Sequence, residues 1–192
     1  MGNAYNCIKE TCCPKNKEKN DLNINENTHL IEDCDYKEKN KEFFKLLNDI
    51  RKHPNIHIGD SKKYNLFDNF FELNSSKDCE DLIYSENNIN IIKEIKKYII
   101  NKFESNKRNV DKEEDIKIII NKERIEKIKD ICLFEVTFDN FDDIEQNVWT
   151  FLEEKKDKFD KIFSKEYNNL IIVSFSIKEN SRIFTNLIFF KD

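Results

Sequence analysis

The side chains most open to chemical modification lie at the start of the chain. The sequence opens with MGNAYNC, and two more thiols follow closely. Removal of the initiator methionine would expose Gly2, as N-myristoylation requires, and Cys7, Cys12 and Cys13 lie where a membrane-resident acyltransferase can palmitoylate them. Asn6 departs from the Ser or Thr preferred at the sixth position. We therefore predict lipidation at the glycine and at the three thiols.

Two acylation signals are needed for a stable anchor. One myristoyl chain binds a bilayer only marginally, with a constant on the order of 10⁴ M⁻¹, and the nearby thiols offer the second signal. Four lysines against two glutamates in the first twenty residues add a weak attraction to an anionic leaflet. The sequence thus predicts anchoring to membrane lipid, at the cytoplasmic face of a membrane, through N-terminal acyl chains. The alternative is an unmodified N-terminal tail in which the Met-Gly-Asn start and the three cysteines occur by chance.

Other familiar chemistries lack the residues that they need. The two glycines, Gly2 and Gly59, are too few for a glycine-rich phosphate loop, and a net charge of -5 disfavours nucleic acid as a partner. The three histidines, His29, His53 and His57, all precede the predicted sheet, where nucleophilic catalysis would need one. We predict no catalytic residue, no metal site and no cofactor, and hence not an enzyme.

The two later thiols have no partner at metal-ligand spacing. Cys79 and Cys132 are far apart, and the chain contains no C-x-x-C pair. In a reducing compartment such cysteines behave as small apolar side chains, so we expect both to be buried.

The 192 residues suit one domain with a tail. The first part, 1–38, is rich in Lys, Glu, Asn and Asp after its thiols, a composition that cannot bury enough apolar surface to fold alone. We interpret it as an acylated, flexible tether. Regular apolar periodicity begins near its end, so we place one globular domain at 39–192.

The first half of this domain has helical periodicity. Apolar residues at helical spacing predict a helix from about Asn40 that ends before Pro54, and a second helix from about Asn88 to Glu104. The charged segment 105–115 is typical of a loop. The isoleucine-rich segment 116–128 fits either a helix or a strand followed by a helical turn.

The second half alternates between strand and helix patterns. Ile131–Phe138 is rich in β-branched and apolar residues, as strands are, and Asp139–Asp143 supplies turn and N-cap chemistry for an amphipathic helix over 144–152. Two further strands, Leu170–Ile177 and Arg182–Phe190, read as a terminal antiparallel hairpin. The predicted fold class is α+β, with helices packed on an antiparallel sheet.

Several of these segments resemble the CAP domain of cysteine-rich secretory and pathogenesis-related proteins. Glu135 falls at the Glu of that family's Gly-Glu-Asn strand, Trp149 lies in its tryptophan-bearing helix, and Ile162 and Tyr167 match its Ile-x-x-x-x-Tyr segment. The helix from Phe44 to Arg51 is similar to the family's opening Leu-Leu-Asn-x-x-Arg helix. The resemblance implies an α-β-α sandwich that ends in a hairpin.

The chain departs from this family at the residues that carry chemistry. The family's cavity uses two histidines and two acids, sometimes with a divalent metal. Here Lys158 stands where the late histidine is expected, Phe134 replaces the glycine and Val136 replaces the asparagine. The resemblance therefore implies a degenerate domain, in which Glu135 is a paired or edge-exposed carboxylate and not a general base.

Three functions follow as hypotheses. The first is a non-enzymatic, lipid-anchored peripheral membrane protein whose degenerate CAP-like domain binds a protein partner that the sequence does not identify. The second starts from a similarity of the N-terminus to the small acylated inner-membrane-complex (pellicle) proteins of apicomplexan parasites, which carry a pleckstrin-homology-like barrel. The third is residual hydrolase or lipid-binding activity. A pocket lined by convergent polar groups near Glu135 would support it, and a cavity filled by Phe side chains would argue against it.

Overall fold

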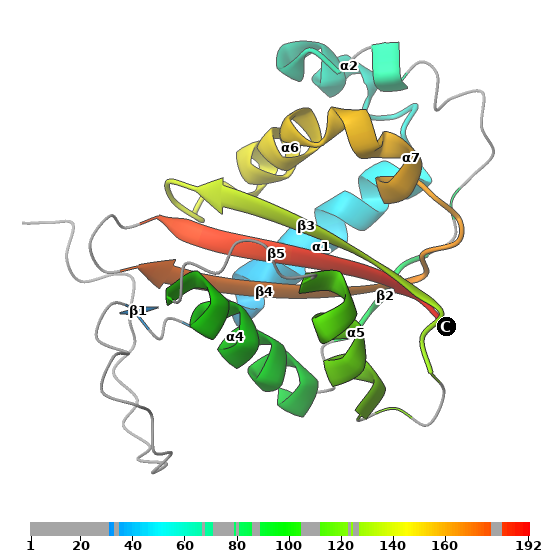
Figure 1. Ribbon diagram of the computed structural model, residues 1–192. Helices are drawn as coiled ribbons and strands as arrows, with labels where there is room; N and C mark the ends of the chain where they lie inside the picture. The colour runs from blue at the N-terminus through cyan, green and yellow to red at the C-terminus, as the bar shows by residue number, and fades with distance from the viewer. Residues whose placement is uncertain are drawn as a thin grey trace, which may run out of the picture.

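The computed structural model describes most of the chain after residue 30 (Figure 1). The described ranges are 31–32, 35–66, 68–70, 79, 81–85, 89–104, 112–122, 124, 127–177 and 182–192. The predicted lipidation residues Gly2, Cys7, Cys12 and Cys13 lie outside them. Within these ranges, no helix combines the length and the apolar character needed to cross a bilayer.

The described elements alternate between helices and strands. The helices are α1 (Lys37–Lys52), α2 (Ile58–Ser61), α4 (Ile89–Glu104), α5 (Lys112–Lys122), α6 (Ile144–Glu154) and α7 (Phe159–Ile162), with 3₁₀ turns at Lys62–Tyr64 and Lys156–Lys158. The strands are β1 (Ile31–Glu32), β2 (Ile83–Tyr84), β3 (Asp130–Phe138), β4 (Asn169–Ile177) and β5 (Ile183–Lys191). The predicted α+β class is confirmed.

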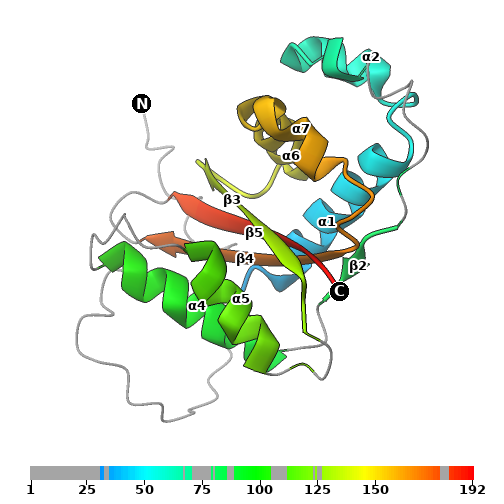
Figure 2. The ribbon, with the colours of Figure 1, turned by 45° about the vertical axis from the view of Figure 1, so that its right-hand side comes forward.

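The strands form one mixed sheet in the order β1-β4-β5-β3. β5 pairs antiparallel with both β3 and β4 along most of its length, whereas β1 and β2 pair with the two ends of β4, β1 antiparallel and β2 parallel. Helices α1 and α6 lie on one face of the sheet, and α4 and α5 lie on the other (Figures 1 and 2). The described part of the chain is therefore built in three layers.

Each face of the sheet buries its own apolar cluster, because side chains alternate along a strand. On β3, Phe134 and Val136 contribute to the cluster under α1 and α6. On β4, Val173 and Phe175 contribute to the cluster under α4 and α5. Residues on both faces of the two central strands are consequently apolar, which explains their nearly continuous hydrophobic sequence.

Most of the predicted elements are present. α1 ends two residues before Pro54, α4 begins at Ile89, and β3 covers Asp130–Phe138. The Asp143 carboxylate caps α6 by accepting the Gln146 backbone N–H at 2.9 Å. The segment 116–128, whose sequence fitted either a helix or a strand followed by a helical turn, is helical as far as Lys122, the last residue of α5.

Three sequence predictions need correction. β1 and the start of α1 fall inside the range 1–38, so the folded part begins before residue 39. α5 begins at Lys112, inside a segment predicted as a loop, because Ile116 and Ile120 face the sheet. The thiols Cys79 and Cys132 are half-buried, not fully buried.

Trp149 of α6 is buried, and it packs on aromatic residues of the segment 57–70. Its ring stacks on Tyr64 at 5.3 Å between centroids and lies 5.5 Å from the ring of Phe70. Val148, Trp149 and Leu152 all belong to the cluster under α1 and α6. Through Tyr64 and Phe70, the tryptophan joins α6 to the segment 57–70.

Arg51 joins α1 to the chain that leads into β4. Its guanidinium is buried and donates to the backbone oxygens of Ile162 at 2.7 Å, Ser164 at 2.9 Å and Tyr167 at 3.3 Å. Burial lowers the pKa of this guanidinium from its ordinary value, although arginine remains protonated in proteins. One arginine thus fixes three carbonyl groups of an irregular segment.

Candidate functional site

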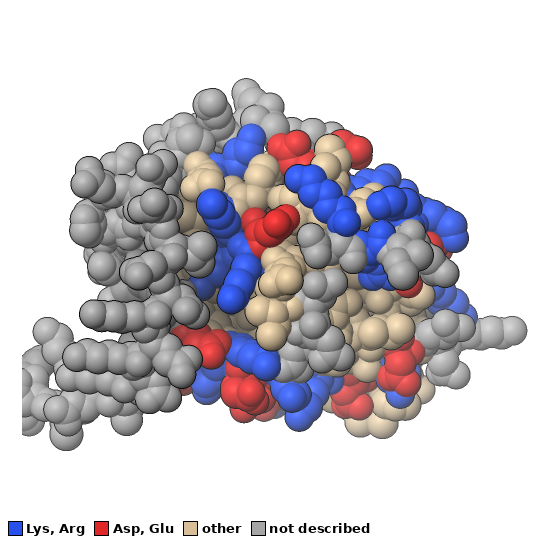
Figure 3. All heavy atoms as spheres, turned by 90° about the horizontal axis from the view of Figure 1, so that it is seen from below, with Lys and Arg blue, Asp and Glu red and all other residues tan. Residues whose placement is uncertain are grey.

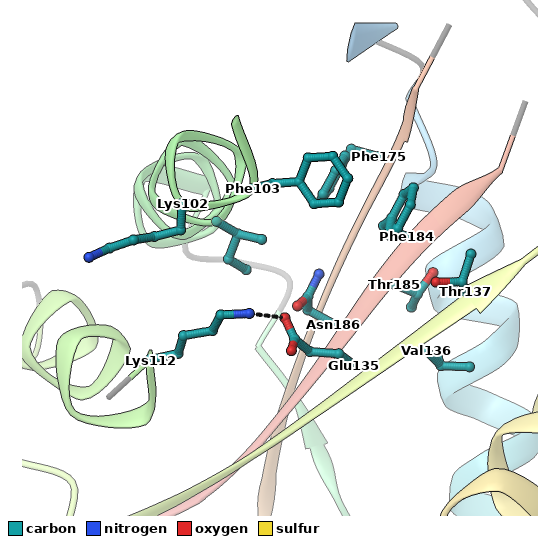
Figure 4. A pocket seen from close by; sticks show the side chains of 11 residues that line it. Lys102, Phe103, Lys112, Glu135, Val136, Thr137, Phe175, Phe184, Thr185 and Asn186 are labelled. Carbon is teal, nitrogen blue, oxygen red and sulfur yellow. Dashed lines mark hydrogen bonds and ion pairs between the residues drawn. The ribbon is translucent and has the colours of Figure 1, made fainter. Parts of the chain in front are cut away.

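A pocket of about 450 Å³ opens between the sheet and the helices α4 and α5 (Figure 4). It lies on the face opposite α1 and α6, beside Glu135 of β3. A pocket of this size falls in the range that small organic ligands occupy. Its lining combines charged, amide and aromatic side chains: Ile99, Lys102, Phe103, Lys112, Glu135, Val136, Thr137, Phe175, Phe184, Thr185 and Asn186.

One end of the pocket is polar. Lys112 Nζ donates to Glu135 Oε1 at 2.7 Å, so the carboxylate and the ammonium neutralise each other, as we expected of a paired Glu135. Lys102 Nζ lies 3.7 Å from Asp115 Oδ2. This end therefore presents hydrogen-bonding groups with their charges largely balanced.

Asn186 is the unusual residue of the polar end. It lies opposite Glu135 in the β3–β5 register, and it is 2% exposed. Its Oδ1 is buried and has no hydrogen-bond partner among the described residues. A buried acceptor without a partner costs about 1–3 kcal/mol of stability, a cost that a ligand N–H or O–H group would offset.

The other end of the pocket is aromatic. Phe175 of β4 and Phe184 of β5 stack at 5.6 Å, and Phe103 of α4 packs edge-on against Phe184 at 4.9 Å. These rings form a wall at one end and leave the rest of the pocket open, as Figure 4 shows. Both the polar groups and the phenylalanines that we named as discriminating features are therefore present, side by side.

The described histidines are remote from this pocket. His57 Nε2 lies 2.9 Å from Asp49 Oδ2, and its ring lies 6.3 Å from that of Trp149 on the other side of the sheet. His53 caps the end of α1 in the same layer. His57 is thus a hydrogen-bond partner of Asp49 within that layer. Neither imidazole can act on a group bound beside Glu135.

Lys158, which we expected at the position of the CAP family's late histidine from the sequence resemblance, also lies away from Glu135. Its Nζ lies 5.9 Å from the ring centroid of Phe134, which faces the α1/α6 layer. Glu135 faces the opposite way because it is the next residue along β3. Among the described residues there is no cluster of three His, Cys, Asp or Glu side chains that would hold a metal ion.

The two described thiols are not part of this site. Burial raises the pKa of the Cys132 thiol to about 11, so it carries almost no thiolate at neutral pH. Cys79 Sγ donates to the Phe163 backbone oxygen at 2.9 Å. Both positions are structural in character.

Sequence reasoning missed three residues that define the pocket: Asn186, Lys112 and Phe103. A signal was present for the first, since an amide interrupts an otherwise apolar strand, and buried amides need partners. No comparable signal marks Lys112 or Phe103, because the docking of α4 and α5 on the sheet brings them to Asn186.

Comparisons of the chain with protein-family models, curated proteins and solved structures found no match. Function must therefore be inferred from the N-terminal sequence and from the arrangement of the described residues.

Proposed function

We propose that this chain is a lipid-anchored peripheral membrane protein whose folded part is a non-enzymatic, CAP-like interaction domain. The anchor is the acylated segment with Gly2, Cys7, Cys12 and Cys13, on the cytoplasmic face of a membrane. The observation that carries the non-enzymatic part is the pairing of Glu135 with Lys112 at 2.7 Å, with both described histidines on the opposite side of the sheet. An ion-paired carboxylate with no histidine beside it supports a binding role over acid–base catalysis.

The three-layer arrangement supports a CAP-like fold over the pleckstrin-homology-like alternative. The sheet is open, in the order β1-β4-β5-β3, and helices cover both of its faces. A pleckstrin-homology-like fold would instead be a closed barrel of strands. The position of Glu135 on β3, and of Trp149 on the helix that follows, agrees with the order of elements in the CAP family. The cellular role as an acylated membrane protein is the same under either fold.

The anchor is tested by replacing Gly2 with alanine. We expect Gly2→Ala to move the protein from the membrane fraction to the soluble fraction, because loss of the myristoyl chain also removes the transient membrane contact that precedes palmitoylation. Asn3→Ala is the matched control and should leave the distribution unchanged. Membrane association of the Gly2→Ala chain at the level of the control would contradict an N-terminal acyl anchor.

A second candidate function, binding of a small amphipathic molecule, is favoured by the unpartnered Oδ1 of Asn186. The ligand would place an N–H or O–H donor on Asn186 and an apolar body against the phenylalanine wall. Anilinonaphthalene sulfonate has both features and is a suitable fluorescent probe. We expect stoichiometric binding that is lost in Thr137→Trp, which fills the pocket, and kept in Lys45→Trp on α1. Equal binding by both variants would exclude this pocket.

A further inference from the structure

One side of α4 carries a line of apolar and basic side chains. Spacings of four and three residues align them beside the face that is buried against the sheet, so that Lys96 and Ile100 are half-buried and Phe103 also contacts Phe184. The line, here the α4 stripe, consists of Ile89, Lys93, Lys96, Ile100 and Phe103.

Two of the three apolar members of the α4 stripe are exposed. Ile89 is 57% exposed and Phe103 is 44% exposed, whereas Ile100 is half-buried and the opposite side of the helix buries Ile91 and Ile95 against the sheet. On the neighbouring helix α5, Ile118 is 48% exposed. Three of the five large hydrophobic side chains that are most exposed in the described part of the chain therefore lie on these two helices.

The charge of α4 is opposite in sign to that of the whole chain. The helix contains four lysines and two glutamates, whereas the chain has a net charge of -5. Lys93 and Lys96 lie between the apolar members of the stripe, and Lys97 is exposed beside them. Figure 3 looks onto this face, where basic side chains and uncharged atoms lie next to one another.

The N-terminal segment enters the fold near one end of this helix. β1 pairs with the end of β4, with Glu32 opposite Ser176. The next residue along β4, Phe175, has its ring 6.1 Å from the ring of Phe103, the last member of the stripe. The chain that leads to the proposed acyl anchor therefore starts beside the C-terminal end of α4.

We infer that the α4 stripe is a membrane-docking surface that lies flat on an anionic leaflet, with Ile89 and the exposed part of Phe103 in the interface and the lysines at the headgroups. An apolar line flanked by lysines, on a helix about 24 Å long, has the character of interfacial amphipathic helices. This inference deepens the proposed function and rests on it, because the acyl chains bring the stripe to the bilayer. It fixes which face of the domain is turned to the lipid and leaves the α1/α6 layer facing the cytosol.

Vesicle binding of the full chain tests the basic part of the stripe. We expect Lys93→Gln/Lys96→Gln to weaken binding to vesicles of phosphatidylcholine and phosphatidylserine by roughly 25-fold, at about fivefold for each lysine. Binding to pure phosphatidylcholine vesicles should not change. Lys45→Gln/Lys62→Gln, with both lysines exposed on the opposite layer, is the matched control and should bind as the unaltered chain does.

The apolar part is tested by Ile89→Ser, which we expect to weaken binding roughly tenfold, since contact with the acyl boundary is lost. Ile56→Ser is the control, because Ile56 is 74% exposed on the other side of the molecule. None of these substitutions touches the core, so unchanged thermal unfolding serves as the check that each variant is folded.

Equal binding by stripe and control variants would overturn the membrane-docking surface and leave α4 as a face for a protein partner. The test is separable from that of the anchor. The unacylated Gly2→Ala chain should show the same ratios between variants on phosphatidylserine vesicles, at lower overall binding. If the native chain carries no acyl group but these ratios appear, the anchor fails and the docking surface stands.

Discussion

Replacing Trp149 with alanine is expected to lower the free energy of unfolding by about 3–5 kcal/mol, the usual loss for a fully buried large aromatic side chain. Trp149 is 1% exposed and contacts the rings of Tyr64, Phe70 and His57. Its loss would leave a cavity between α6 and the segment 57–70, beside Tyr64 and Phe70. Equilibrium denaturation in urea measures the change.

Trp149→Phe is the informative companion variant. A smaller ring keeps part of the stacking on Tyr64, so we expect a free energy of unfolding between that of the native chain and that of the alanine variant. If Trp149→Ala unfolds at the same denaturant concentration as the native chain, the packing of the segment 57–70 against α6 is wrong. Proteolysis within that segment gives an independent readout, since it should become faster in the alanine variant.

The second large effect is expected at Arg51. Arg51→Met keeps most of the apolar stem but removes the donors to Ile162, Ser164 and Tyr167, which leaves three buried carbonyls without this partner. Hydrogen bonds from a charged donor contribute about 1.5–3 kcal/mol each and are not additive, so we expect a total loss of about 3–5 kcal/mol.

Arg51→Lys separates charge from geometry at this site. An ammonium group keeps the positive charge but cannot reproduce the planar fork that reaches three oxygens, so an intermediate loss is expected. A change of less than about 1 kcal/mol in the methionine variant would contradict the structural role of Arg51. This residue was visible in sequence only as a match to the CAP family's opening helix, and its partners lie more than 100 positions away.

Elements with a single periodicity could be predicted from the sequence. α4 has apolar residues at helical spacing, and β3 has a β-branched run followed by an acidic N-cap at Asp143. α5 was ambiguous because Ile118, Ile119 and Ile120 are consecutive, which suits a strand, and Ile118 in fact faces solvent. The local pattern cannot distinguish helix from strand in such a run, since the outcome depends on which residues pack against the sheet.

The pocket could not be predicted, because its members meet only through tertiary pairing. Asn186 lies beside Glu135 as a result of the β3–β5 register, and Lys112 reaches Glu135 only once α5 docks on the sheet. A strand shifted by one residue would place Asn186 on the other face. The sequence carried the residue types of the site but not their juxtaposition.

The most direct test of lipid anchoring is the mass of the N-terminal peptide of the native chain, isolated from the cells that make it. We predict a peptide without Met1, with a myristoyl amide on Gly2, and with thioester-linked palmitate on one or more of Cys7, Cys12 and Cys13 that hydroxylamine releases. An N-terminal peptide that carries no acyl group, from protein in the membrane fraction, would contradict the proposed function.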